Sequence, residues 1–107
     1  MELRFALNLV HADKPQDRVG LYVFFDISQI IDTIQTRTTL ISKDYELGDC
    51  DYHCEIVPDV GSDGFTVKFI WVYKDDNKTH CFSSSIQGLP MALYFESLLK
   101  IKTEYEQ

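Results

Sequence analysis

Five residues of the types that hold metals or act as nucleophiles fall in two short clusters. Cys50, His53 and Cys54 form the first cluster, and His80 and Cys81 form the second. Thiolates and imidazoles are the usual zinc ligands, but a C-x2-H-C spacing with a distant H-C pair does not match a zinc-finger pattern. On a strand, His53 and Cys54 would also point to opposite faces. We therefore expect reduced thiols, no bound metal and no cofactor.

Nucleophilic catalysis is also poorly supported by the sequence. A cysteine nucleophile needs an imidazole in contact with a partly exposed thiol. Cys54 and His80 can share a sheet face, but a packed sheet face is a poor place for a reactive thiol. The run Ser83-Ser84-Ser85 lacks the glycines of a nucleophile elbow, and no glycine-rich phosphate loop is present. The sequence therefore predicts a protein that is not an enzyme.

The negative charge of the chain comes from one segment. The net charge is −7, yet residues 1–43 and 64–107 each hold five acidic and five basic residues. Residues 44–63 hold seven acidic residues, two tyrosines and no Lys or Arg. This segment is a poor match to a calcium-binding loop, because a loop starting at Asp49 has neither Gly at its sixth position nor Glu at its twelfth.

An acidic segment of this kind favours recognition of a basic protein. Such a surface attracts basic partners and repels nucleic acids and anionic membranes, and tyrosine is common at interfaces. We expect a non-enzymatic, acidic inhibitor or immunity-type protein that covers the basic active surface of a toxin or nuclease. The predicted partner-binding residues are Asp44, Tyr45, Glu46, Asp49, Asp51, Tyr52, Glu55, Asp59 and Asp63.

Two other interpretations stay open. The acidic segment can simply keep the protein soluble. Alternatively, the protein is a structural or adaptor subunit that pairs with itself or with a larger protein, through the aliphatic stripe from Ile27 to Ile34 or through a sheet edge. The N-terminus lacks a secretion signal, the apolar stretches are too short to span a bilayer, and the cysteine count is odd, so we expect a cytoplasmic protein.

The first half of the chain must position this segment. Residues 2–10 alternate apolar and polar side chains, which predicts a half-buried strand. Over residues 19–36, apolar residues recur at steps of three and four, which favours one helix from Gln16 to Gln35. The alternative is a strand to Asp26 followed by a shorter helix. The stretch from Thr38 to Ile41 is either a brief strand or the end of that helix.

The second half is a predicted β meander. Candidate strands cover residues 52–57, 65–73 and 79–86, with turns at 61–64 and 75–78 between them. In the middle strand, Phe69 and Trp71 share the core face and Lys68 lies opposite. Pro90 suits the first turn of a second helix. We expect a single α+β domain over residues 1–107, with an antiparallel sheet of about four strands, two helices packed on one face and the order β-α-(β)-β-β-β-α.

Overall fold

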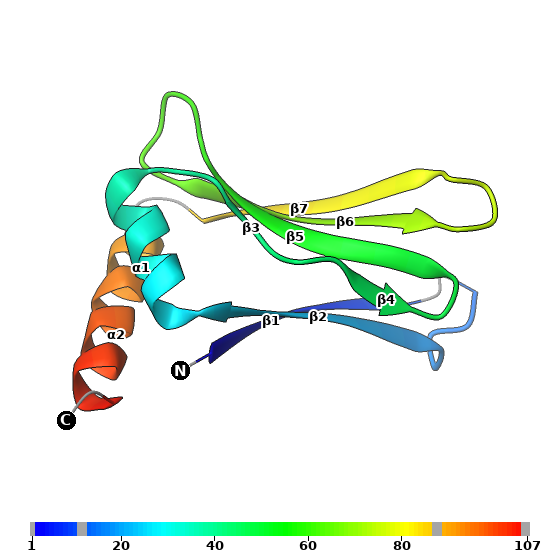
Figure 1. Cartoon of the computed structure of the whole chain (residues 1–107), viewed down its shortest axis with the longest axis horizontal. Coiled ribbons are helices and arrows are strands. Elements are labelled where there is room, and N and C mark those ends of the chain that lie inside the picture. The colour runs from blue at the N-terminus through cyan, green and yellow to red at the C-terminus, as the bar shows by residue number, and fades with distance from the viewer. Residues whose placement is uncertain (1, 11–12, 87–88, 106–107) are drawn as a thin grey trace.

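The described residues form two antiparallel sheets and two helices (Figure 1). The computed structural model describes residues 2–10, 13–86 and 89–105. The predicted α+β class and the antiparallel pairing are confirmed. The elements are β1 (Glu2–Val10), β2 (Arg18–Asp26), α1 (Ile27–Thr36), β3 (Leu40–Ile41), β4 (Tyr45–Leu47), β5 (Cys50–Pro58), β6 (Phe65–Tyr73), β7 (Thr79–Ile86) and α2 (Leu89–Tyr105).

β1 and β2 pair along their whole length as a separate two-stranded sheet. The predicted alternation of β1 is confirmed, because Leu3, Phe5, Leu7 and Leu9 are half-buried and the residues between them are exposed. The favoured helix from Gln16 to Gln35 is wrong, and the alternative of a strand to Asp26 is right. Leu21, Val23 and Phe25 are buried at every second position, so this segment follows the two-residue period of a strand and not the period of a helix.

α1 begins at a capping box. The Asp26 carboxylate accepts a hydrogen bond from the Ser28 N–H at 2.8 Å, and the Gln29 side-chain oxygen accepts one from the Asp26 N–H at 3.3 Å. The helix buries Ile27, Ile30 and Ile31 in the core. The aliphatic stripe proposed as an adaptor surface is therefore a packed core face, which rules it out as a docking site.

The second sheet contains the remaining five strands. β5, β6 and β7 pair in sequence order, while β3 and β4 both pair with the other edge of β5. The register places Trp71 opposite Tyr52 and Phe69 opposite Cys54 on the inner face. As predicted, Lys68 lies on the opposite face from Phe69 and Trp71. β4 was not predicted, and β5 is longer than the expected strand over residues 52–57.

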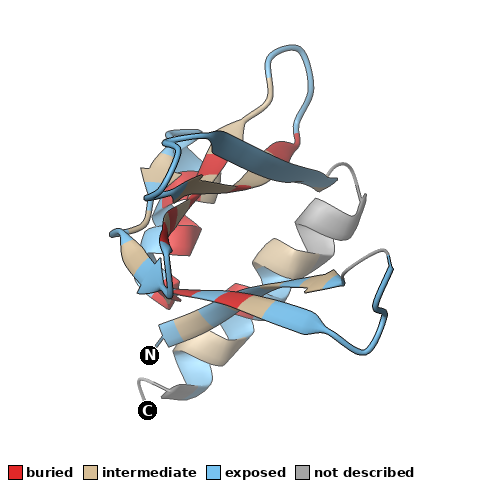
Figure 2. Ribbon diagram, turned by 90° about the vertical axis from the view of Figure 1, so that its right-hand side faces the viewer, coloured by how far each residue is buried: buried red, intermediate tan, exposed pale blue. Residues whose placement is uncertain are grey.

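The core lies between the two sheets, as the buried segments in Figure 2 show. The helices contact each other and stand at one end of both sheets, where Leu98 of α2 joins the core (Figure 1). The opposite end is formed by the strand ends of β4, β5 and β6 and by the turns beside them.

The two long sides of this sandwich differ. On one side, Tyr45 and Tyr52 reach from the second sheet to the edge of β2, where their hydroxyls bond to backbone groups of Tyr22 and Phe24. On the other side, β1 and β7 flank an apolar groove of about 270 Å³. One side is thus closed by hydrogen bonds and the other is open.

Candidate functional site

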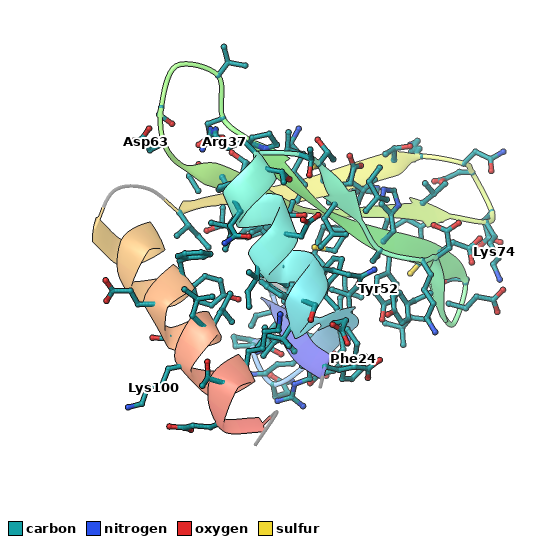
Figure 3. All side chains as sticks on the ribbon, turned by 60° about the vertical axis from the view of Figure 1, so that its left-hand side comes forward. Phe24, Arg37, Tyr52, Asp63, Lys74 and Lys100 are labelled. Carbon is teal, nitrogen blue, oxygen red and sulfur yellow. The ribbon has the colours of Figure 1, made fainter. Side chains whose placement is uncertain are left out.

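The seven carboxylates of residues 44–63 do not form one surface, because β5 runs between them. Its nine residues span roughly 30 Å. Asp49 and Asp51 lie at the first end of β5, whereas Asp59 and Asp63 follow the other end. Figure 3 shows this separation, with Lys74 at one end of the molecule and Asp63 at the other. The prediction of a single acidic patch is therefore wrong in its extent.

The first group gains two carboxylates from the next hairpin. The Lys74 N–H donates to the Asp49 carbonyl at 2.8 Å, which holds the β4–β5 turn against the end of β6. The turn after Lys74 carries Asp75 and Asp76, both exposed. We call the five carboxylates at this end the acidic end; they are Glu46, Asp49, Asp51, Asp75 and Asp76.

Lys74 neutralises only part of the acidic end. Its ammonium lies 3.7 Å from a carboxylate oxygen of Glu46 and 3.7 Å from one of Asp51. The Glu46 side chain remains 77% exposed and that of Asp51 50% exposed. Lys78 of the same turn adds a second positive charge, so the five carboxylates exceed the two ammonium groups by three and this end keeps a net negative potential.

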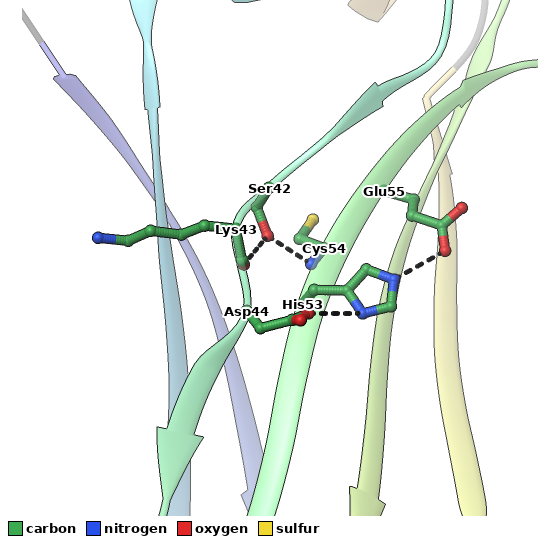
Figure 4. A network of polar contacts seen from close by, with 6 residues as sticks. All are labelled: Ser42, Lys43, Asp44, His53, Cys54 and Glu55. Atoms are coloured by element: carbon green, nitrogen blue, oxygen red, sulfur yellow. Dashed lines mark hydrogen bonds and ion pairs between the residues drawn. The ribbon is translucent and has the colours of Figure 1, made fainter.

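A second acidic feature lies on the outer face of the five-stranded sheet. The His53 Nε2 atom is 2.9 Å from a Glu55 carboxylate oxygen, and its Nδ1 atom is 3.7 Å from one of Asp44 (Figure 4). Ser42 accepts a hydrogen bond from the Cys54 N–H at 2.9 Å and so holds the segment before β4 against β5. The His53 ring therefore lies between the carboxylates of Asp44 and Glu55 on this face.

Asp59 and Asp63 belong to a loop that is organised by a cation. Arg37 has φ of 52°, and its guanidinium donates to the carbonyls of Asp59, Ser62 and Asp63 at 2.9 to 3.1 Å. The Asp59 carboxylate accepts a hydrogen bond from Thr66 at 2.5 Å. These two acids lie beside the positive charge of Arg37, and the Asp59 carboxylate stabilises the loop through its hydrogen bond with Thr66.

The two tyrosines of the acidic segment are structural. Tyr52 is only 7% exposed, and its ring stacks on that of Tyr45 with centroids 5.5 Å apart. The Tyr52 hydroxyl donates to the Tyr22 carbonyl at 2.9 Å and accepts from the Tyr22 N–H at 3.3 Å. We therefore withdraw Tyr52 from the predicted partner-binding residues, because its side chain joins the two sheets.

An apolar pocket of about 550 Å³ opens beside the acidic end. Leu47 and Cys50 of its wall flank the β4–β5 turn, and Tyr73 precedes Lys74 in the chain. Its volume lies in the range of pockets that hold a ligand or a partner side chain. The remaining wall comes from Trp71, from the facing ends of β1 and β2 and from Gln16 and Asp17 before β2, so Arg18 and Asp17 contribute opposite charges.

The cysteine and histidine clusters are divided by the sheet. Cys54 is fully buried on the inner face while His53 lies on the outer face, as predicted. His80 shares the inner face with Cys54, but β6 separates their strands, and His80 stacks on Trp71 at 5.8 Å. Burial raises the pKa of Cys54 to about 12, which keeps its thiol protonated. Within the described residues, no three His, Cys, Asp or Glu side chains gather as a metal site.

Sequence reasoning missed the pocket and the contribution of Asp75 and Asp76. The turn at residues 75–78 was predicted, and antiparallel pairing of the strands around it places that turn beside residue 49. The antiparallel strand pairing was therefore the sequence signal that would have placed Asp75 and Asp76 next to the acids of the β4–β5 turn. The pocket carried no such signal, because its walls come from both sheets.

The part of the chain that the structure describes contains no helix with the length and apolar character needed to cross a bilayer. Comparisons of the chain with protein-family models, with curated proteins and with solved structures found no match.

Proposed function

We propose that this chain is a protein-binding domain that recognises a basic partner through the acidic end and the apolar pocket beside it. The observation that carries the proposal is their adjacency: five exposed or half-exposed carboxylates lie at the same end of the sandwich as a 550 Å³ pocket, and the pocket wall includes Leu47, Cys50 and Tyr73, which are chain neighbours of the acidic end. Protein interfaces combine an apolar anchor in a pocket with a polar, charged rim.

The partner class follows from the charge. Proteins that act on nucleic acids are basic where they bind phosphate. A carboxylate-rich surface competes for the same side chains, so a nuclease or toxin with such an active surface is the proposed target. The protein would act as an inhibitor or immunity-type protein rather than as an enzyme, and we propose the cytoplasm as its location because its cysteines are free thiols.

The two parts of the surface have different kinetic roles. Exposed rim charges steer the approach of a partner, so they set the association rate and its salt dependence. A buried apolar anchor sets the dissociation rate. The carboxylates should therefore govern how fast the partner binds, and Leu47 of the pocket wall should govern how long it stays.

A capture experiment with matched variants tests the proposal. The acidic-end variant is Asp49→Asn with Asp75→Asn and Asp76→Asn. The control is Asp32→Asn with Asp63→Asn and Glu96→Gln, which changes the charge equally on exposed residues at the helical end. Each variant is immobilised beside the wild-type protein, and proteins captured from the native host are identified by mass.

The proposal predicts that the wild-type protein and the control retain a basic protein that the acidic-end variant loses. Association of that protein should slow and lose salt dependence in the acidic-end variant, whereas Leu47→Ser should speed its dissociation. Capture of the same proteins by all three forms would mean that the acidic end serves only solubility.

A further inference from the structure

β7 is an edge strand that lacks the usual protection of an edge. Within the described residues it pairs only with β6, and its eight residues contain no Asp, Glu, Lys, Arg or Pro. Its register with β6 is continuous from Thr79 to Ile86, without a bulge. Folded proteins shield free edges with charges, prolines, bulges or a covering element, since an open edge pairs with other chains.

The edges of the two-stranded sheet are shielded. Tyr45 and Tyr52 cover the edge of β2 by bonding to its backbone. β1 carries the charged residues Glu2 and Arg4, and Arg4 lies over the Tyr22 ring at 5.2 Å. β7 therefore differs from these edges in having neither a cover nor a charge.

The backbone of β7 is set up for another strand. The Tyr73 N–H donates to the Lys78 carbonyl at 3.3 Å, in the same register that pairs Phe69 with Phe82. Hydrogen-bonded pairs alternate along an antiparallel ladder, so the backbone groups that face away from β6 belong to Thr79, Cys81, Ser83 and Ser85.

The inner face of β7 is also incompletely covered. Phe82 is 46% exposed although its neighbour Phe69 is buried, and both line the groove that separates β7 from β1. Phe5 and Leu7 form the β1 wall of this groove. A strand added beside β7 would place its own inward side chains over the groove and cover Phe82.

We propose that the added strand is β7 of a second copy, paired antiparallel about a two-fold axis so that the two five-stranded sheets become continuous. Charge favours this occupant. Self-pairing brings no charged side chain of one β7 against the other. It also directs the acidic ends of the two copies to opposite ends of the dimer, about 26 Å of strand apart and beyond the screening length of roughly 8 Å.

The dimer leaves the proposed partner surface free. β7 and β4 lie on opposite edges of the five-stranded sheet, so Glu46, Asp49 and Asp51 of the acidic end and the Leu47 wall of the pocket lie away from the paired edge in both copies. The inference does not depend on the proposed function, because it rests on the uncharged edge and the groove alone.

Sedimentation across a range of protein concentrations tests the pairing. The wild-type protein should sediment with twice the mass of one chain. The variant Ser83→Lys with Ser85→Lys adds two exposed charges to the edge and should weaken dimerisation at least about tenfold, because like charges across a strand pair repel. The variant Gln35→Lys with Thr39→Lys adds the same charge on exposed residues outside β7 and should remain a dimer.

A cross-link provides a second test that needs no loss of binding. Ser83→Cys in a Cys81→Ser background should form a disulfide-linked dimer under mild oxidation, whereas Thr66→Cys in the same background, on the inner strand β6, should not. A wild-type protein that is monomeric at every concentration would overturn the proposal. So would a dimer that the lysines leave unchanged and that Ser83→Cys does not cross-link.

Discussion

Removal of one hydroxyl tests how the two sheets are joined. Tyr52→Phe keeps the ring that stacks on Tyr45 but loses the donor to the Tyr22 carbonyl and the acceptor for the Tyr22 N–H. Each hydrogen bond contributes about 1 kcal/mol, and a poorly solvated group left without a partner costs about 1–3 kcal/mol. We therefore expect the free energy of unfolding to fall by about 1–3 kcal/mol.

Tyr45→Phe is the matched control. Its hydroxyl accepts one exposed hydrogen bond, from the Phe24 N–H at 3.2 Å, so the expected loss is below about 1 kcal/mol. Urea denaturation followed by circular dichroism gives both values. The reasoning fails if Tyr52→Phe costs no more than Tyr45→Phe, since the bond to Tyr22 would then contribute nothing to the closed side of the sandwich.

Three further perturbations probe the rest of the fold. Asp26→Ala removes the α1 cap and should cost about 1 kcal/mol in thermal unfolding; an unchanged midpoint would contradict the capping box. Trp71→Ala should cost about 2–4 kcal/mol, because Trp71 is half-buried on the inner face, and a loss below about 1 kcal/mol would place it outside the core. The pKa of Cys54 is raised to about 12 in the fold, so the folded state holds its proton more tightly. Stability should fall as pH rises above about 9, by up to about 1.4 kcal/mol per pH unit, and Cys54→Ala should show a smaller slope in denaturation at several pH values.

The strands were predictable wherever the spacing of apolar residues fitted only the two-residue period of a strand. β1, β6 and β7 followed from alternation and turn residues. The segment from Val19 to Ile34 failed because the inward residues of β2 and the buried isoleucines of α1 together fit a helical spacing. The aromatic and β-branched run ending at Asp26, a good capping residue, carried the information that distinguishes the two.

The candidate site was predictable in composition but not in arrangement. Tyr52 lies in the alternating series Cys50, Tyr52, Cys54 and Ile56, all of which face the core. That series was visible in the sequence and would have placed the tyrosine inside. In contrast, the hydrogen bonds from Arg37 to carbonyls of the 59–64 loop join residues more than 20 positions apart. Neither the sequence around Arg37 nor that of the loop shows a pattern that indicates these bonds.

The central claim is that a basic partner binds at the acidic end, and a footprint tests it most directly. Backbone amide shifts of the isotope-labelled protein can be followed while the captured basic protein is added. We expect the largest changes at residues 46–51 and 74–78, which contain the acidic end, with little change at 59–64. Largest changes at residues 59–64, with 46–51 unaffected, would contradict binding at the acidic end.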